Sequence, residues 1–345
     1  MSFAAIAGQP AALSTLRNAL AVERLAHAYL FVGLSGVGKK RTALALAQAL
    51  LCPEQAGTGC ETCATCRAVA DGTHPDLNLV APQAGKTTLG IDQVRELQHF
   101  LSLQSARGNR KIGVIEDAQV LTPQAQSSLL KIVEEPPGNA LLILLSVSAA
   151  SLSRPLLSRC QQVRFAALPP ATVELLLVQQ HALSAAEAHA LALYSRGSIG
   201  RALSLDAGVF TEERRHLLDA LEQLEGAPFG RVSELAEWLV ADRTKKSRTR
   251  TDRSERPAGG DRLELILSWY EERLRYVLLG QDGVIRYADC LPVLAQATHG
   301  LGVEEALRQL RLVYDAIRAL GRNANPRLAV EDLLLQLAAR ATDEG

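Results

Sequence analysis

Apolar runs that alternate with helical patterns organise the first half of the chain. Short apolar stretches have the length and composition of buried strands; they occur at Ala28–Val32, within Lys111–Ala118 and at Leu141–Val147, and Gly72–Val80 has the pattern of a turn that enters a further strand. Between them, Ile91–Leu103 carries apolar residues at helical spacing, and Thr122-Pro123 has the residue types of a helix N-terminus. Strands that alternate with helices predict a parallel sheet with helices on both faces.

A glycine-rich loop follows the first of these strands. It reads Gly33-Leu34-Ser35-Gly36-Val37-Gly38-Lys39-Lys40 and precedes a run of strong helix formers. A strand, a glycine loop and a helix in this order are the context that a phosphate-binding P-loop requires. If such a loop binds a ligand, that ligand is ATP or ADP, because loop N–H groups and a helix N-terminus attract phosphate. The candidate binding residues are Gly33, Gly36, Gly38, Lys39 and Lys40.

Two departures from the motif argue against hydrolysis at this loop. A Ser or Thr normally follows the loop lysine, because its hydroxyl ligates Mg²⁺, but here the residue is Lys40, a cation that repels metal. The acidic pair that ends the second strand is Glu116-Asp117, whereas P-loop ATPases use the order Asp-Glu. We therefore expect little or no turnover. Nucleotide binding without turnover stays open, since the glycines and Lys39 are present.

Four of the six cysteines lie at metal-ligand spacing. Cys52, Cys60, Cys63 and Cys66 are separated by seven, two and two residues, and Cys-x-x-Cys spacing lets two thiolates reach one ion. We expect a structural Zn²⁺ with four thiolate ligands and no position left open for catalysis. The alternative is an iron–sulfur cluster, but ferredoxin motifs place their fourth cysteine after the third and not before the first.

The composition of the 345-residue chain narrows the function classes. Lys+Arg and Asp+Glu both total 37, so charge does not indicate wholesale non-specific binding of nucleic acid. Neutral charge and few aromatic residues also disfavour a zinc-dependent nucleic-acid-binding module as the function. No apolar run approaches the roughly 18 residues of a membrane span, and the N-terminus lacks a signal-peptide pattern. A cytoplasmic protein with reduced cysteines is expected.

Two basic segments stand out from this neutral background. Residues 242–261 combine Lys and Arg with Ser, Thr and paired Gly, which predicts a disordered insertion. A smaller basic turn contains Arg107, Arg110 and Lys111, and it is expected to be solvated. Contact with DNA phosphates is the alternative for both segments.

Several short motifs occur in an order that is typical of one protein family. They are His27-Ala28-Tyr29-Leu30-Phe31, the Gly33 loop, the four cysteines, Gly72-Thr73-His74-Pro75-Asp76, Glu134-Glu135-Pro136-Pro137 and Leu157-Ser158-Arg159-Cys160. On these residues the chain resembles the bacterial sliding-clamp loader subunits of the AAA+ class, strongly over about the first 205 residues and more loosely beyond. The resemblance implies an α/β AAA+ P-loop domain at 1–165 with a zinc module at about 52–66, a helical lid at 166–207 and an all-α collar for oligomerisation at 208–345.

Clamp loaders contain two similar types of chain. One is the ATP-hydrolysing motor (gamma/tau), and the other has degenerate ATPase motifs. Lys40, the Glu116-Asp117 order, and Gly200 at the place of the motor's nucleotide-sensing arginine favour the second type; the motor is the alternative. The resemblance also implies a catalytic role for Arg159, which would reach into the ATP site of a neighbouring subunit. A lone arginine, taken by itself, is an ordinary surface residue.

The resemblance implies a set of partners as well. They are the motor subunits (gamma/tau), the delta subunit and, through the complex, the sliding clamp and primer–template DNA. The chain is expected to help load the clamp during replication, as part of the DNA polymerase III holoenzyme. It is not expected to be an enzyme on its own or to bind a membrane.

Overall fold

The structure of the protein is a computed structural model that describes residues 3–83, 86–105, 110–224, 226–241, 260–283, 286–287, 290–322 and 324–339. Contacts divide the chain into two compact units. The first comprises Met1–Ala182 and Ser195–Leu203, and the second comprises Leu183–Tyr194 and Ser204–Gly345. The predicted basic insertion at 242–261 lies outside the described residues except at its end. The predicted domain boundaries at 165 and 207 stay a prediction.

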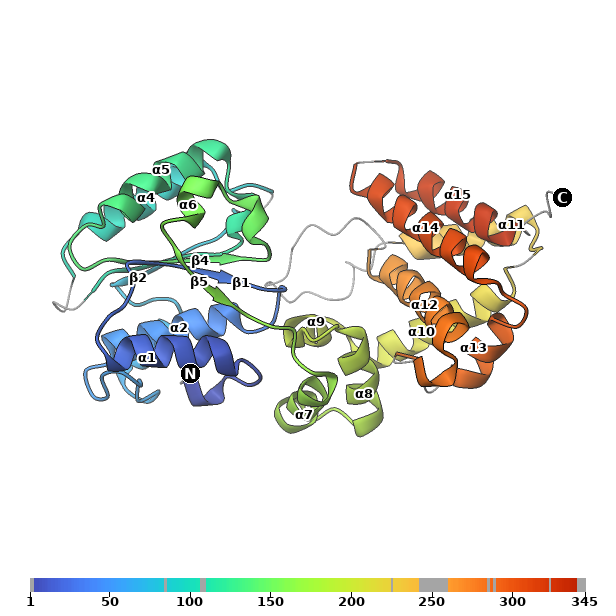
Figure 1. The fold of residues 1–345 in the computed structure, drawn as a ribbon, viewed down its shortest axis with the longest axis horizontal. Helices are drawn as coiled ribbons and strands as arrows, with labels where there is room; N and C mark the ends of the chain where they lie inside the picture. The colour runs from blue at the N-terminus through green and yellow to red at the C-terminus, as the bar shows by residue number, and fades with distance from the viewer. Residues whose placement is uncertain are drawn as a thin grey trace. The chain divides into compact units, whose positions relative to one another are not determined.

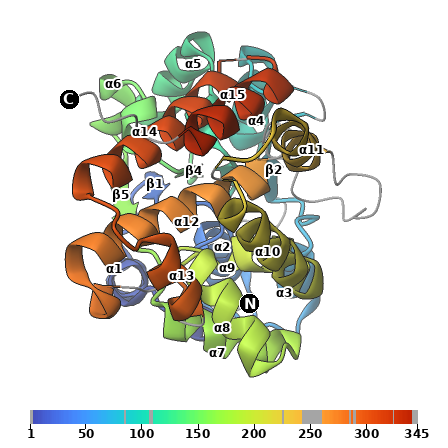
Figure 2. The same cartoon turned by 90° about the vertical axis from the view of Figure 1, so that its right-hand side faces the viewer.

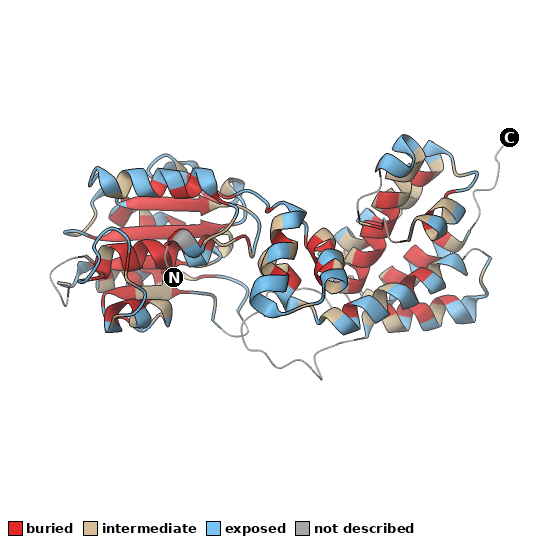
Figure 3. Cartoon of the chain, turned by 90° about the horizontal axis from the view of Figure 1, so that it is seen from below, coloured by how far each residue is buried: buried red, intermediate tan, exposed pale blue. Residues whose placement is uncertain are grey.

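A five-stranded parallel sheet forms the centre of the first unit, with the strand order β2-β3-β4-β1-β5. Its strands are β1 (Ala28–Val32), β2 (Leu77–Val80), β3 (Ile112–Ile115), β4 (Leu141–Ser146) and β5 (Gln161–Arg164). The predicted strands are therefore present as β1 to β4, with β2 at one edge, and β5, which the sequence did not predict, completes the sheet at the other edge. Figure 3 shows the strands as the most continuously buried part of this unit.

Helices cover both faces of this sheet, as Figure 1 shows. The helices of the first unit are α1 (Pro10–Ala21), α2 (Lys39–Leu51), α3 (Ala64–Ala70), α4 (Ile91–Ser102), α5 (Pro123–Glu134), α6 (Arg154–Leu157), α7 (Pro170–His181) and α9 (Ile199–Ser204), with short 3₁₀ turns η1 (Phe3–Ala5), η2 (Ala118–Val120) and η3 (Ala149–Ser151). Helices α1 and α2 lie on one face, and α4 and α5 lie on the other. This arrangement confirms the predicted α/β P-loop fold.

Alternation along the strands produces the two apolar layers. Tyr29 and Phe31 of β1 pack with the α1 and α2 side, whereas Leu30 packs with Leu97 of α4 and Leu129 of α5. Successive strand residues point to opposite faces, so an apolar run that is covered on both faces must be apolar throughout. This burial holds the ends of the strands, and therefore the loops that follow them, in fixed positions.

The second unit is helical in its described part. Its elements are α8 (Ala185–Tyr194), α10 (Ala207–Glu222), α11 (Phe229–Val240), α12 (Gly260–Leu279), η4 (Gln281–Gly283), α13 (Leu291–Ala297), α14 (Val303–Leu320) and α15 (Pro326–Ala338). Helix α12 packs along α14, and α11 packs along α15 (Figure 2). Trp269 and Tyr287 meet edge to face in the core, with ring centroids 5.1 Å apart. None of the helices in the described part of the chain combines the length and the apolar character that crossing a bilayer requires.

Candidate functional sites

The P-loop connects the end of β1 to the start of α2, as the glycine pattern predicts. Gly36 and Gly38 have φ angles of 73° and 104°, in the left-handed region that glycine tolerates best. Helix α2 begins at Lys39, and its first N–H groups have no partner within the helix. The loop therefore has the backbone of a phosphate site, and it brings Gly33, Gly36, Gly38, Lys39 and Lys40 together.

Lys39 is folded back onto its own loop. Its Nζ donates to the carbonyl oxygen of Gly33 at 2.5 Å and to that of Leu34 at 2.7 Å. Burial lowers the pKa of Lys39 to about 8, against the opposing effect of the Asp117 carboxylate. The ammonium that would meet a terminal phosphate thus lies inside the loop and is held by two carbonyls.

Lys40 lies where the metal-ligating hydroxyl would stand, and it has its own counter-ion. Its Nζ is 2.6 Å from Oε1 of Glu116, the residue that follows β3. The next residue, Asp117, has a φ of 51° and accepts a hydrogen bond from the Gln119 amide. One of the two acidic groups of the degenerate ATPase motif is therefore paired with the cation that replaces the hydroxyl.

A second segment of the chain lies directly against the P-loop. The N–H of Gly200, at the start of α9, donates to the carbonyl oxygen of Gly36 at 3.0 Å. A Cβ added at Gly200 would lie 2.8 Å from the Gly36 Cα, and one added at Gly36 would lie 2.4 Å from Ser198 Oγ. Two backbones approach this closely only because both residues are glycine. Helix α9 therefore packs directly against the P-loop.

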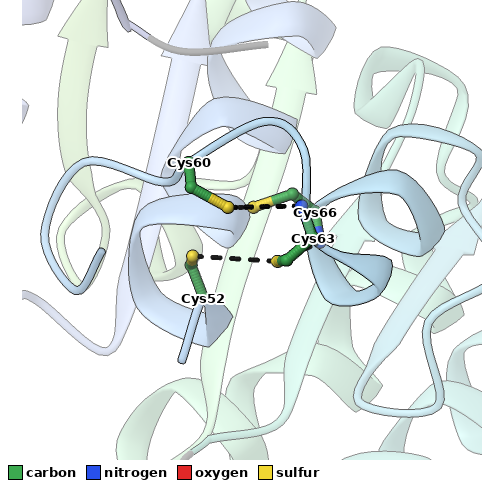
Figure 4. Close-up of side chains that lie close together, drawn as sticks. All are labelled: Cys52, Cys60, Cys63 and Cys66. Carbon is green, nitrogen blue, oxygen red and sulfur yellow. Dashed lines mark hydrogen bonds between the residues drawn. The ribbon is translucent and has the colours of Figure 1, made fainter. Parts of the chain in front are cut away.

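The four cysteines converge on one point (Figure 4). Cys52 follows the last residue of α2, Cys60 and Cys63 lie in the connecting loop, and Cys66 lies in the first turn of α3. All four sulfur atoms lie within 4.8 Å of one another. The Cys52–Cys63 and Cys60–Cys66 sulfur pairs are each separated by 3.9 Å. Four ligands at about 2.3 Å around a tetrahedral zinc ion lie about 3.8 Å apart, so the cluster has the size of a metal site.

Local hydrogen bonds support this geometry. The N–H of Cys63 donates to the sulfur of Cys60 at 3.3 Å, and the N–H of Cys66 donates to the sulfur of Cys63 at the same distance. Burial tends to raise the pKa of Cys52, but backbone donors led by Gln55 outweigh it and lower the pKa to about 6. Burial raises the pKa of Cys66 to about 12. The cluster could hold a metal ion once its thiols lose their protons.

Arg159 lies at the opposite end of the sheet from the P-loop. It follows α6 and precedes β5, and β5 pairs in parallel with β1 from Tyr29↔Gln161 to Val32↔Arg164. The P-loop follows the last residue of β1, whereas Arg159 precedes the first residue of β5. Each strand residue rises about 3.3 Å, so the paired segment separates the end that carries the P-loop from the end that carries Arg159 by roughly 10 Å or more. The arginine is therefore placed away from the P-loop of its own chain.

The guanidinium of Arg159 has three contacts. Its Nη2 is 2.9 Å from Oε1 of Glu134, and its Nη1 donates to Pro155 O at 3.0 Å and to Ser158 Oγ at 3.4 Å. The side chain is 40% exposed, which leaves it accessible to another molecule. No local signal in the sequence predicts the contact with Glu134, which lies 25 positions earlier.

Known proteins resemble this chain over different lengths. A family model described as "DNA polymerase III, delta subunit" matches residues 8–169. DNA polymerase III subunit delta′ of Bacillus subtilis is 29% identical over 95% of this chain and 96% of its own length. The Escherichia coli subunit of the same name is 36% identical over 56% of this chain and 59% of its own length.

The match also extends to subunits of a second name. DNA polymerase III subunit tau of Salmonella typhimurium is 35% identical over 59% of this chain but only 32% of its own length. The delta′ subunit of Bacillus subtilis, by contrast, matches this chain nearly from end to end. The P-loop fold and the four-cysteine cluster therefore occur in a chain that is similar to DNA polymerase III delta′ subunits.

Proposed function

We propose that the chain is the delta′ subunit of a DNA polymerase III clamp loader and helps to place the sliding clamp on primed DNA. Its proposed partners are the gamma/tau motor subunits, the delta subunit and, through the complex, the clamp and the DNA. In this assembly the chain is a weak or inactive ATPase that acts in the cytoplasm. It supplies Arg159 to the ATP site of a neighbouring motor subunit.

The observation that carries the inactive-ATPase part of the proposal is the 2.6 Å contact between Lys40 and Glu116. Hydrolysis at a P-loop requires Mg²⁺ beside the loop hydroxyl and the acidic pair. Here an ammonium takes the place of the hydroxyl and neutralises one of the carboxylates. Mg²⁺ would have to displace a cation that is covalently attached to the site, and no hydroxyl would remain to ligate it.

Two further contacts support the same conclusion. Lys39 donates to carbonyls of its own loop, and Gly200 donates to Gly36. Both contacts connect the phosphate-binding loop to the chain itself. Turnover would need both to rearrange, whereas an assembly role needs neither to change.

The position of Arg159 supports a role in trans. A transition-state arginine must reach the γ-phosphate of the nucleotide it serves, and such residues raise turnover by about 10³- to 10⁵-fold. Arg159 precedes β5, at the other end of the sheet from its own P-loop. Its half-exposed guanidinium is therefore available to a different chain.

The proposed metal at the cysteine cluster is a structural Zn²⁺. Four thiolates supply a complete tetrahedral shell, so the ion would have no open position for a water or a substrate. The residues that would hold it are Cys52, Cys60, Cys63 and Cys66. Such an ion would connect the end of α2 to α3 and would take no part in ATP chemistry.

The experiment that tests the proposal has two parts. The purified chain, mixed with ATP and Mg²⁺, should show no turnover above background. Arg159→Ala should leave the fold of the chain intact but slow ATP-driven clamp loading by the reconstituted complex. Brisk turnover by the isolated chain would favour the alternative, a gamma/tau-type motor subunit. The similarity to tau subunits is the reason for considering this alternative. An unchanged loading rate with Arg159→Ala would refute the role in trans.

A further inference from the structure

Arg159 is held by two different parts of the first unit. Pro155 O and Ser158 Oγ belong to the turn from which Arg159 itself projects. Glu134 is the last residue of α5, a helix that packs on the sheet. Of these three contacts, the 2.9 Å contact with Glu134 is the one that comes from a different element, helix α5.

This distinction matters for a residue that acts at a distance. An arginine side chain has many rotamers, and a free guanidinium would spend little time in the one that points toward a neighbouring active site. The contacts with Pro155 and Ser158 hold the guanidinium beside its own segment, which Leu156 anchors in the core. A contact with α5 restrains it with respect to the sheet, and so with respect to any subunit that docks on this domain.

The contact does not use up the binding capacity of the arginine. A guanidinium carries five N–H donors, so three acceptors leave room for a phosphate oxygen. Glu134 and Arg159 are 47% and 40% exposed, and ion pairs between groups of this exposure add little to folding stability. A change at Glu134 should therefore affect the placement of Arg159 without unfolding the domain.

We propose that Glu134 is the positioning residue for Arg159. Its carboxylate holds the guanidinium in the orientation that the neighbouring ATP site requires, before that site is engaged. The inference rests on the proposed function, since it assumes that Arg159 acts in trans. No bond is made or broken by Glu134; it acts only through Arg159.

The test uses the complete reconstituted clamp loader with single substitutions in this chain. Glu134→Ala should lower the maximal rate of DNA-stimulated ATP turnover to about a third of wild type or less, because misplacement of a catalytic group lowers kcat. The KM for ATP should stay within about twofold, since Glu134 does not touch the nucleotide. Glu134→Gln should recover most of the rate, because its amide oxygen can still accept from the guanidinium. Glu135→Ala, which removes the adjacent exposed carboxylate, is the matched control and should match wild type.

Combining Glu134→Ala with Arg159→Ala distinguishes a failure of the positioning role from a failure of the proposed function. If Arg159→Ala has no effect, the proposed function fails. If Arg159→Ala slows turnover, adding Glu134→Ala to it should cause no further loss, because the two residues act as one unit. Three outcomes overturn the positioning role alone: a wild-type rate with Glu134→Ala, a faster rate, or an equal extra loss in the Arg159→Ala background. Thermal unfolding of each free variant checks that the fold is unchanged.

Discussion

Lys40 and Glu116 form an ion pair of 2.6 Å between the first turn of α2 and the end of β3. Residues of these two elements hold Mg²⁺ in hydrolysing P-loop proteins. Here the chain supplies its own positive charge at that place. The Lys40 ammonium therefore balances the charge of the Glu116 carboxylate, as a divalent ion would in a hydrolysing protein.

This relationship predicts how nucleotide binding responds to Mg²⁺. Any binding of ADP to the wild-type chain should not be strengthened by Mg²⁺, because Lys40 repels the ion. Lys40→Thr restores a hydroxyl and frees Glu116, so Mg²⁺ should strengthen binding to this variant. Isothermal titration with and without Mg²⁺ measures both effects. Arg41→Thr, the same change at the exposed next residue, is the control. A Mg²⁺ requirement in the wild type would contradict the prediction.

The same substitution should be structurally harmless. The Lys40 side chain is 51% exposed, and an ion pair of this exposure contributes about 1 kcal/mol or less. Thermal unfolding of Lys40→Thr should therefore lie close to that of wild type. A large loss of stability would contradict this expectation, because it would mean that the ion pair contributes substantially to the stability of the fold.

Removal of the metal should destabilise the first unit. The purified chain is expected to contain zinc, and its extraction by a chelator should lower the melting temperature, because the ion fixes the end of α2 against α3. Cys60→Ser should lose the metal, whereas Cys290→Ser, outside the cluster, should keep it. Elemental analysis separates zinc from iron. Unchanged stability of the metal-free protein would count against a structural role.

The thiols also set the pH dependence of metal binding. The pKa of Cys66 is raised to about 12 by burial, so without metal this thiol keeps its proton at neutral pH. The metal must displace that proton, and its affinity should therefore fall as the pH is lowered. A competition titration against a chelator at several pH values measures this slope. A flat profile would be inconsistent with thiolate ligands.

Lys39 should titrate below the ordinary lysine range. Burial lowers its pKa to about 8 from an ordinary value of 10.5. Between these values the folded protein binds fewer protons than the unfolded chain, so the contribution of Lys39 to the unfolding free energy rises with pH across this window. NMR of lysine Cε carbons should show one signal that titrates near pH 8 and disappears in Lys39→Met. If every lysine signal titrated near pH 10, the prediction would be wrong.

The local pattern of the sequence was sufficient for strands β1 to β4, the P-loop and the cysteine cluster, but not for β5, in which only Val163 is buried. Each depends on residues that are close in sequence or on burial on both faces of a sheet. The prediction of a solvated basic turn was wrong for Lys111. This residue is 8% exposed, its Nζ is 3.1 Å from the buried carboxylate of Asp76, and it also lies over the Phe100 ring. Arg107 lies outside the described residues.

The contacts that the sequence did not predict share one physical cause. Lys111 with Asp76, Glu134 with Arg159 and Gly36 with Gly200 are each pairs from separate elements. Their proximity follows from strand order and helix placement, which no local pattern specifies. A lysine such as Lys111 can be buried because an anion lies beside it, and here that anion, Asp76, is remote in sequence.

The Gly36–Gly200 contact gives a prediction in which local propensity and packing have opposite effects. Gly200 lies in α9, and replacing a helical glycine by alanine normally stabilises a protein by about 0.5–1 kcal/mol. Gly230 in α11 has nothing within 4 Å of an added Cβ, so Gly230→Ala should follow that rule. At Gly200 the added Cβ would meet the Gly36 Cα at 2.8 Å, and a backbone atom cannot turn aside as a side chain does. Overpacking of this kind costs about 1–3 kcal/mol.

The two substitutions should therefore differ in hydrogen exchange of α9. In Gly200→Ala, the helix must move off the P-loop, the hydrogen bond from Gly200 N–H to Gly36 O is lost, and amide exchange across Ile199–Ser204 should accelerate. In Gly230→Ala the exchange of this helix should match wild type. Because α9 covers the loop in the wild type, Gly200→Ala should also bind nucleotide at least as well as the parent. Slow exchange in Gly200→Ala would contradict the prediction, because it would show that the two backbones are not in close contact in solution.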